Sequence, residues 1–250
     1  DATVMRHTSE EETEMQAQMN AHRGRYGEIP FYTLDAETRE RVAALVAEAG
    51  EAAKVDEHGS WDFGIASLNR RGTRWQALNW DLYAHGLDAH TGALLAVVQV
   101  RQVVSGRRWN RVRKNYFLIG TNEDGTAFAH PVSANAVHAA IRAGRDVIRA
   151  VQDWIFGCDY GLVIRQGDIA LIPLRRAAGE RTPLRSMVLE DSHALEASEL
   201  RFGGDGVVYA KDPRLTHLPG AHPTVEATGW HKIVSGRRAA FWRFAAPTVD

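Results

Sequence analysis

A series of apolar segments separated by turns in the middle of the chain limits its possible folds more than any other feature. Segments rich in β-branched and aromatic residues, as strands are, occupy residues 74–84, 93–104, 109–120 and 126–130. Turn residues separate them at Gly86, Gly92, Ser105-Gly106 and Asp124-Gly125. Because such short connections join antiparallel neighbours, the pattern predicts an antiparallel sheet.

A helical period follows the last of these segments. Ser133 is a candidate N-cap, and apolar side chains then recur at helical spacing as far as Gly157. The sequence therefore predicts a long helix over 134–156, and a similar stripe after Asp35 predicts another over 36–53. Further short strands are predicted at 162–174, 186–189, 206–210, 230–234 and 239–244.

These patterns together predict an α+β fold. In it, an antiparallel sheet is packed by a long helix and followed by a small all-β unit, with parts at 1–160 and 161–250 that may share one core. The single Cys158 excludes an intramolecular disulfide, which suits a reducing compartment. The chain shows neither a secretion signal nor an apolar run of bilayer length, so we expect a cytoplasmic protein.

Charge is distributed unevenly along the chain. Residues 1–60 hold 13 acidic and 6 basic side chains, whereas residues 61–150 hold 12 basic and 6 acidic ones. No acidic residue lies between Asp88 and Glu123, and aromatic residues alternate there with basic ones. Cationic groups neutralise phosphates and aromatic rings stack on unpaired bases, so this stretch predicts a surface for RNA or single-stranded DNA.

The residues expected to bind nucleic acid lie on a hairpin over 101–117. They are Arg101, Arg107, Arg108, Trp109, Arg111, Arg113, Lys114 and Tyr116, with Trp61, Trp75 and Trp80 nearby. Alternate strand residues point the same way, so Arg101 is expected to share a face with Arg111 and Arg113. The predicted helix adds His138, Arg142, Arg145 and Arg149 on one stripe. Alternatively, these arginines are solvated or paired with the acidic N-terminal segment, and the aromatic rings form core.

Four histidines in the last quarter of the chain suggest a different chemistry. They are His193, His217, His222 and His231. Three converging imidazoles could hold zinc or another transition metal, and two could act as acid and base near neutral pH. Asp191 or Asp212 is a candidate to orient an imidazole. The spacings match no metal-binding motif, and surface or structural histidines are the plainer interpretation.

The segment Arg165-Gln166-Gly167-Asp168 opens an apolar strand that ends at Pro173. This strand resembles the opening of small uncharacterised β proteins of bacteria and their phages. The resemblance continues at Val188-Leu189, Ser192-His193, Leu215-Thr216-His217, His222 and Val249-Asp250, so it covers about residues 165–250. Those proteins often carry a Gly-His-x-His pair, and Asp191 and Ser192 replace its first part here. The resemblance implies a β fold and the histidines, without a function.

Three functions remain open on this reading. The first is an intracellular accessory protein that binds RNA or single-stranded DNA through its basic hairpin. The second is a hydrolase centred on the histidines, either metal-dependent or using acid–base catalysis. The third is a protein–protein interaction subunit, whose basic sheet binds an acidic partner or the acidic N-terminal segment of a second copy in a homo-oligomer.

Overall fold

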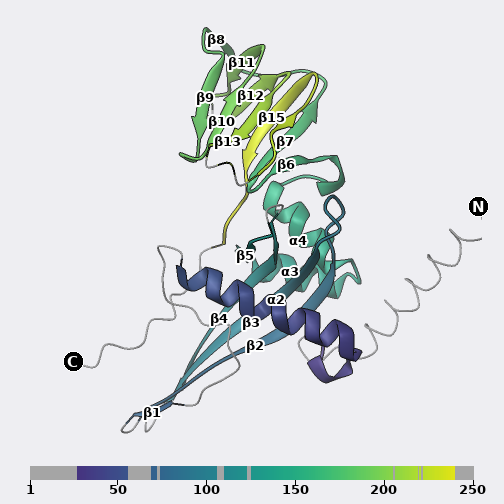
Figure 1. Ribbon diagram of the computed structural model, residues 1–250, viewed down its shortest axis with the longest axis vertical. Helices are drawn as coiled ribbons and strands as arrows, with labels where there is room; N and C mark the ends of the chain where they lie inside the picture. The colour runs from purple at the N-terminus through teal and green to yellow at the C-terminus, as the bar shows by residue number, and fades with distance from the viewer. Residues whose placement is uncertain are drawn as a thin grey trace, which may run out of the picture.

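The computed structural model describes residues 27–55, 69–71, 74–105, 110–122, 125–204, 206–218, 220 and 222–239. A central sheet of five antiparallel strands follows the chain order β1-β2-β3-β4-β5 (Figure 1). The strands are β1 (Asn69–Arg71), β2 (Arg74–Leu87), β3 (Leu94–Ser105), β4 (Asn110–Thr121) and β5 (Ala127–Val132). Four of them match the strands predicted over 74–130 to within three residues, which confirms the antiparallel sheet.

Consecutive residues of the central sheet enter two different cores. Val98 and Phe117 join a buried cluster with α2 (Ala36–Val55), which Asp35 caps by accepting a 2.8 Å hydrogen bond from the Thr38 N–H. Val97 and Leu118 join a second cluster with the helices on the other face. Because side chains alternate along a strand, the sheet is the middle layer of three (Figure 1).

The helix predicted over 134–156 is wrong as a single element. The chain forms α3 (Ala134–Arg142) and α4 (Val147–Phe156) instead. Gly144 adopts φ +62° after α3, and the Arg145 N–H donates to the Ala140 carbonyl at 3.0 Å, which is how a Schellman motif closes a helix. Asp146 then caps α4 by accepting a hydrogen bond from the Arg149 N–H at 3.1 Å.

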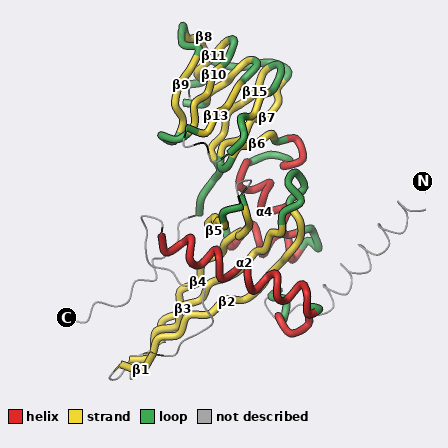
Figure 2. Tube along the Cα trace, in the orientation of Figure 1, coloured by secondary structure: helices red, strands yellow, loops and turns green. Residues whose placement is uncertain are grey.

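The C-terminal β unit, residues 164–235, consists of two antiparallel sheets (Figure 2). One has the order β6-β7-β15-β12-β11-β8 and the other β14-β13-β10-β9. Leu171 and Ile233 from the first sheet and Leu195 and Leu215 from the second share one buried cluster. The unit is therefore a β-sandwich, which agrees with the predicted small all-β unit.

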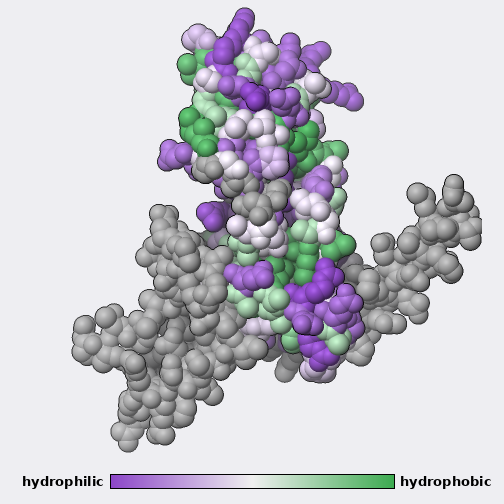
Figure 3. All heavy atoms as spheres, viewed as in Figure 1, coloured by the Kyte–Doolittle hydropathy of each residue, from purple (hydrophilic) through white to green (hydrophobic). Residues whose placement is uncertain are grey.

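The strands of the sandwich are short. The bounds are β6 (Ile164–Gln166), β7 (Ile169–Leu174), β8 (Glu180–Thr182), β9 (Ser186–Leu189), β10 (His193–Glu196), β11 (Glu199–Phe202), β12 (Val208–Lys211), β13 (Arg214–His217), β14 (Val225–Glu226) and β15 (Trp230–Ser235). The strand predicted over 162–174 is a hairpin of β6 and β7, and most of the one predicted over 239–244 lies outside the described residues. In Figure 3, apolar and hydrophilic residues intermingle over this unit.

Two connections join the sandwich to the central layers. The first is the turn η2 (Tyr160–Leu162), where Tyr160 is buried with Val163 and Ala170 in the same cluster as α4. The second is the strap, residues 236–239, which leaves β15 and runs back along α4 and β5. There the Arg237 N–H donates to the Ile155 carbonyl at 2.8 Å and the Ala239 N–H to the Pro131 carbonyl at 3.0 Å.

Among the described residues, no helix combines the length and the apolar composition needed to cross a bilayer. The division of the chain near residue 160 stays a prediction.

Candidate active site

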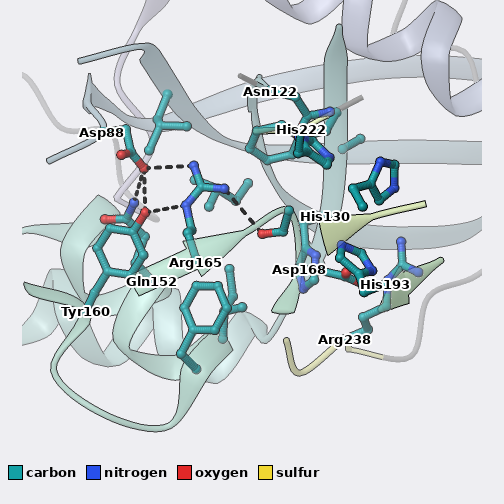
Figure 4. A pocket seen from close by; sticks show the side chains of 18 of the residues that line it. Asp88, Asn122, His130, Gln152, Tyr160, Arg165, Asp168, His193, His222 and Arg238 are labelled. Atoms are coloured by element: carbon teal, nitrogen blue, oxygen red, sulfur yellow. Dashed lines mark hydrogen bonds and ion pairs between the residues drawn. The ribbon is translucent and has the colours of Figure 1, made fainter. Parts of the chain in front are cut away.

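A cavity of about 300 Å³ lies where the central sheet, α4 and the sandwich meet. Its walls come from distant parts of the sequence: Asp88 after β2, Leu118 in β4, Phe156 in α4, His193 in β10 and Arg238 in the strap. Figure 4 shows polar side chains gathered around Asp88 and a histidine group that includes His193 and His222. The volume is at the lower end of the range for small-molecule sites.

A buried network of hydrogen bonds fixes the wall around Asp88 (Figure 4). The Asp88 carboxylate accepts bonds from the Tyr160 hydroxyl at 2.8 Å and the Gln152 amide at 2.9 Å. Its other oxygen accepts the backbone N–H groups of His90 and Thr91. Arg165 donates to the Tyr160 hydroxyl at 2.8 Å and lies 3.7 Å from the carboxylate.

This network keeps Asp88 ionised. Burial raises the pKa of its carboxyl group, but the hydrogen bonds and Arg165 lower that pKa by more, so the result lies below the ordinary value. Burial likewise raises the pKa of Tyr160. The tyrosine therefore stays a neutral donor. Both oxygens of the Asp88 carboxylate accept hydrogen bonds from residues of this wall.

Three of the four predicted histidines meet in the cavity. His193 and His217 are direct partners across the β10–β13 pair, with ring centroids 4.8 Å apart. His222 follows β13 in a loop, and its ring centroid lies 4.7 Å from that of His217. We call these three residues the histidine cluster. His217 occupies the middle of the cluster, so each outer ring has an imidazole neighbour.

His193 is the most buried member of the cluster, with only 3% of its surface exposed. Its Nδ1 shares a 2.9 Å hydrogen bond with the hydroxyl of Ser192. The opposite nitrogen, Nε2, is buried and has no hydrogen-bond partner among the residues that the structure describes. A buried polar atom without a partner costs about 1–3 kcal/mol, so this atom indicates a place for a ligand.

The turns that carry the cluster have special backbone conformations. Glu190 and Asp191 adopt φ of 46° and 53° between β9 and β10, directly before Ser192. Strained turns of this kind concentrate at functional sites. Gly167, with φ +58°, opens the two-residue turn of the β6–β7 hairpin. A Cβ there would lie 3.3 Å from the Nε2 of His222 and 3.7 Å from that of His193, so both nitrogens face this glycine.

The strap completes the cavity on the side of His130. The ring of His130 shares a 2.7 Å hydrogen bond with the Arg237 carbonyl, and the Gly236 N–H donates to the Asp168 carbonyl at 2.8 Å. Arg238 lines the cavity from the strap, close to Asp168 and His193 in Figure 4. The strap therefore adds a guanidinium group to the lining that also holds the histidine cluster.

Burial determines the protonation of the inner histidines. It lowers the pKa of His193, with Asp168 acting in the opposite direction and the neighbouring imidazoles adding to the decrease. Burial also lowers the pKa of His130, partly offset by the Arg237 carbonyl. His193 is consequently a neutral imidazole near neutral pH, able either to accept or to donate a proton at Nε2.

The predicted metal site receives no support from this geometry. Among the described residues, no group of three or more His, Cys, Asp or Glu side chains is arranged to hold a metal ion. The fourth predicted ligand, His231, lies in β15 outside the cavity lining, where its Nδ1 contacts the Gly229 carbonyl at 3.2 Å. Asp212 binds Ser198 and the Gly229 N–H, so it orients no histidine of the cluster.

The basic hairpin differs from the expected nucleic-acid surface. Arg101 pairs with Lys114 across β3 and β4, whereas Arg113 pairs with Gln102 and Arg111 with Val104. Positions 111 and 113 are thus on the opposite face of the sheet from position 101, and the prediction that they share one face is wrong. Stacking by Tyr116 is also wrong, because its ring is buried and its hydroxyl is bonded to Gln99 and His138.

The rest of the basic stretch stays a prediction. Arg107, Arg108, Trp109 and Trp61 lie outside the described residues, and Trp75 belongs to β2. Trp80 packs edge-on against Phe31, 5.1 Å between ring centroids. In the helical stripe, Arg145 and Arg149 form ion pairs with Asp153, and Arg149 also pairs with Asp159. These two guanidinium groups pair with carboxylates in and after α4, and not with the acidic N-terminal segment that the plainer interpretation named.

Comparison of the chain with protein-family models, curated proteins and solved structures finds no match. The resemblance of residues 165–250 to bacterial and phage β proteins therefore stays a prediction.

Several residues of the cavity were not singled out from the sequence. The main ones are Asp88, His130, Gln152, Tyr160 and Arg238. Asp88 and Tyr160 are 72 positions apart, and no motif joins them. One local signal was available, since Ser192 directly precedes His193 and lies within hydrogen-bonding reach of its ring.

Proposed function

We propose that the protein is a hydrolase that uses the histidine cluster for acid–base catalysis on a small substrate. The observation that carries this proposal is the buried Nε2 of His193, which has no partner among the described residues and lines a ligand-sized cavity. Two further imidazoles lie within reach of the same space. Hydrolysis needs one group to take a proton and another to give one, and neighbouring imidazoles supply both.

His193 is suited to be the general base. When its Nδ1–H donates to Ser192, Nε2 carries the lone pair, and this nitrogen lies beside Gly167 in the cavity lining. Ser192 then acts as a positioning residue that holds the ring and its tautomer. Because burial keeps this imidazole neutral, it is ready to accept a proton from an attacking water molecule.

The other two histidines are suited to the acid role. His217 and His222 are partly exposed and border the same cavity, so either reaches solvent protons more readily than His193 does. The water oxygen attacks the ester centre while His193 takes its proton. The leaving oxygen departs with the bond electrons and receives a proton from the protonated imidazole of His217 or His222.

Hydrolysis of chromogenic aryl esters by the purified full chain tests this proposal. The variant His193→Gln is expected to lower kcat by about 100-fold or more, because general-base catalysis contributes roughly 10²–10⁴-fold. A matched control is His85→Gln, which alters a histidine of β2 that lies on the α2 side of the central sheet. Equal activity of His193→Gln and the unaltered chain, or equal loss in both variants, would overturn the proposal.

A further inference from the structure

We infer that the substrate of this site is a phosphate monoester of a small apolar alcohol. The inference rests on the proposed hydrolase for its reaction, but the binding of the ligand is a separate claim. It follows from two unlike groups of residues in the cavity lining: the histidine cluster with Arg238, and a set of apolar side chains that belong to one buried cluster. A ligand that contacts both groups must carry an anionic head on an apolar body.

The polar part of the cavity favours an anion. Arg238 is exposed on the strap and lines the same cavity as the three rings of the histidine cluster. The carboxylate of Asp88 is occupied by Tyr160, Gln152 and backbone N–H groups, so it attracts no cation into the space. Asp168 is the remaining carboxylate of the lining, and Arg238 and the imidazoles outnumber it.

A phosphate group fits this arrangement better than a planar carboxylate does. The donors approach from different directions: Arg238 comes from the strap, His217 from β13 and His222 from a loop. Phosphate presents oxygens in three directions and forms strong charge-assisted hydrogen bonds with guanidinium and imidazolium groups. Gly167 leaves space beside two of the imidazole nitrogens, where a side chain would come within van der Waals contact.

The apolar part of the cavity accepts the alcohol group. Its lining comes from three strands of the central sheet, β3, β4 and β5, and from α4, and consists of Leu95, Leu118, Phe128, Ile155 and Phe156. Leu95 and Ile155 are almost fully buried, so this surface is a preformed part of the core. The total volume of about 300 Å³ suits a single ring or a short chain with its phosphate.

The reaction balances without a further reactant. Water adds its oxygen to phosphorus while the imidazole of His193 takes one proton. The bond between phosphorus and the alcohol oxygen breaks, its electron pair stays on that oxygen, and a protonated imidazole of the cluster supplies a proton. The products are the free alcohol and inorganic phosphate.

Isothermal titration of the full chain with phenyl phosphate tests the ligand class. Phenyl phosphate is expected to bind at least tenfold more tightly than inorganic phosphate or phenol, since each of these matches one part of the cavity only. Arg238→Gln should weaken phenyl phosphate and inorganic phosphate about tenfold, whereas Phe128→Ala should weaken phenyl phosphate alone. Arg237→Gln is the matched control, because Arg237 is the exposed neighbour of Arg238 outside the cavity lining.

Hydrolysis measured on the same samples separates this inference from the proposed function. If phenyl phosphate binds in an Arg238-dependent way and releases no phenol, the proposed hydrolase activity is refuted and the proposed ligand class is retained. If phenyl acetate is hydrolysed in a His193-dependent way and phenyl phosphate neither binds nor competes, the ligand class is overturned. Equal affinity for phenol and phenyl phosphate, or equal effects of Arg237→Gln and Arg238→Gln, would also overturn it.

Discussion

His193 and His217 face each other directly across the β10–β13 pair, and their ring centroids are 4.8 Å apart. Backbone hydrogen bonds of the strand pair therefore fix the spacing of two imidazoles that belong to separate strands. Sites built on strands hold their geometry more closely than sites built on loops. His222, the third member of the cluster, comes from the loop after β13.

The bond between Ser192 and His193 should matter for rate more than for binding. In Ser192→Ala the imidazole of His193 loses the group that holds its tautomer. We expect kcat to fall about tenfold with little change in KM, since the base is misaligned and the cavity is intact. Ser192→Thr keeps a hydroxyl and should recover most of the rate. Equal kcat for the alanine variant and the unaltered chain would show that Ser192 positions nothing.

The Asp88 network should contribute to the stability of the fold. Tyr160→Phe removes the hydroxyl that donates to Asp88 and accepts from Arg165, so each of these two buried charged groups loses one of its hydrogen bonds. We expect the free energy of unfolding to fall by about 1–3 kcal/mol in urea titrations. Tyr32→Phe removes a hydroxyl from a ring that is 79% exposed and should change stability little. Similar stabilities for the two variants would contradict this role of the network.

Buried histidines should make the fold sensitive to mild acid. Burial lowers the pKa of His85 and His193 below the value of 6.5 for a free imidazole. The unfolded chain thus binds more protons than the folded one as the pH drops below about 6.5, and this contribution to stability is lost from there down to the folded-state pKa. Urea titrations at pH 7.5, 6.5 and 5.5 should show a falling free energy of unfolding.

The variant His193→Gln provides the control for this pH dependence. Because glutamine does not titrate, the decrease in stability between pH 7.5 and 5.5 should be smaller than in the unaltered chain. A stability that stays constant or rises on acidification would contradict the assignment of these histidines as buried neutral groups.

The break between α3 and α4 depends on Gly144. Gly144→Ala places a side chain on a residue with φ +62°, although the surrounding space is open. We expect a loss of about 1 kcal/mol in the free energy of unfolding, from backbone strain alone. Gly204→Ala is matched, because it also meets open space but lacks a positive φ. If both variants unfold alike, the left-handed conformation at Gly144 costs nothing.

The sequence predicts local features of this fold better than those that depend on pairing. The strands β2 to β5 follow from alternation and turn residues, which are properties of neighbouring positions. The error over 134–156 arose because the apolar period continues past Gly144 and Asp146, although a glycine followed by a capping residue permits two helices. The face occupied by Arg101 depends on its pairing with Lys114 in β4, which composition does not reveal.

In the candidate site, too, the sequence predicts local features better than features that depend on how distant segments pair. Three of four predicted histidines converge, because β10 pairs with β13 and the next loop folds over the pair. His231 was grouped with them by proximity in sequence, yet it lies in β15 of the other sheet. The wall around Asp88 joins residues 64 and 72 positions away, which only the packing of α4 and η2 on the central sheet brings together.

The strap gives the cavity an order of assembly. Arg238 and its neighbours follow every other wall of the cavity along the polypeptide, so a ribosome makes them after the central layers and the sandwich. During synthesis the histidines can pair across their strands while that side stays open to water. The cavity is complete only when residues 236–239 bind to α4 and β5. We therefore expect the protein to acquire its affinity for the ligand at the last step of folding.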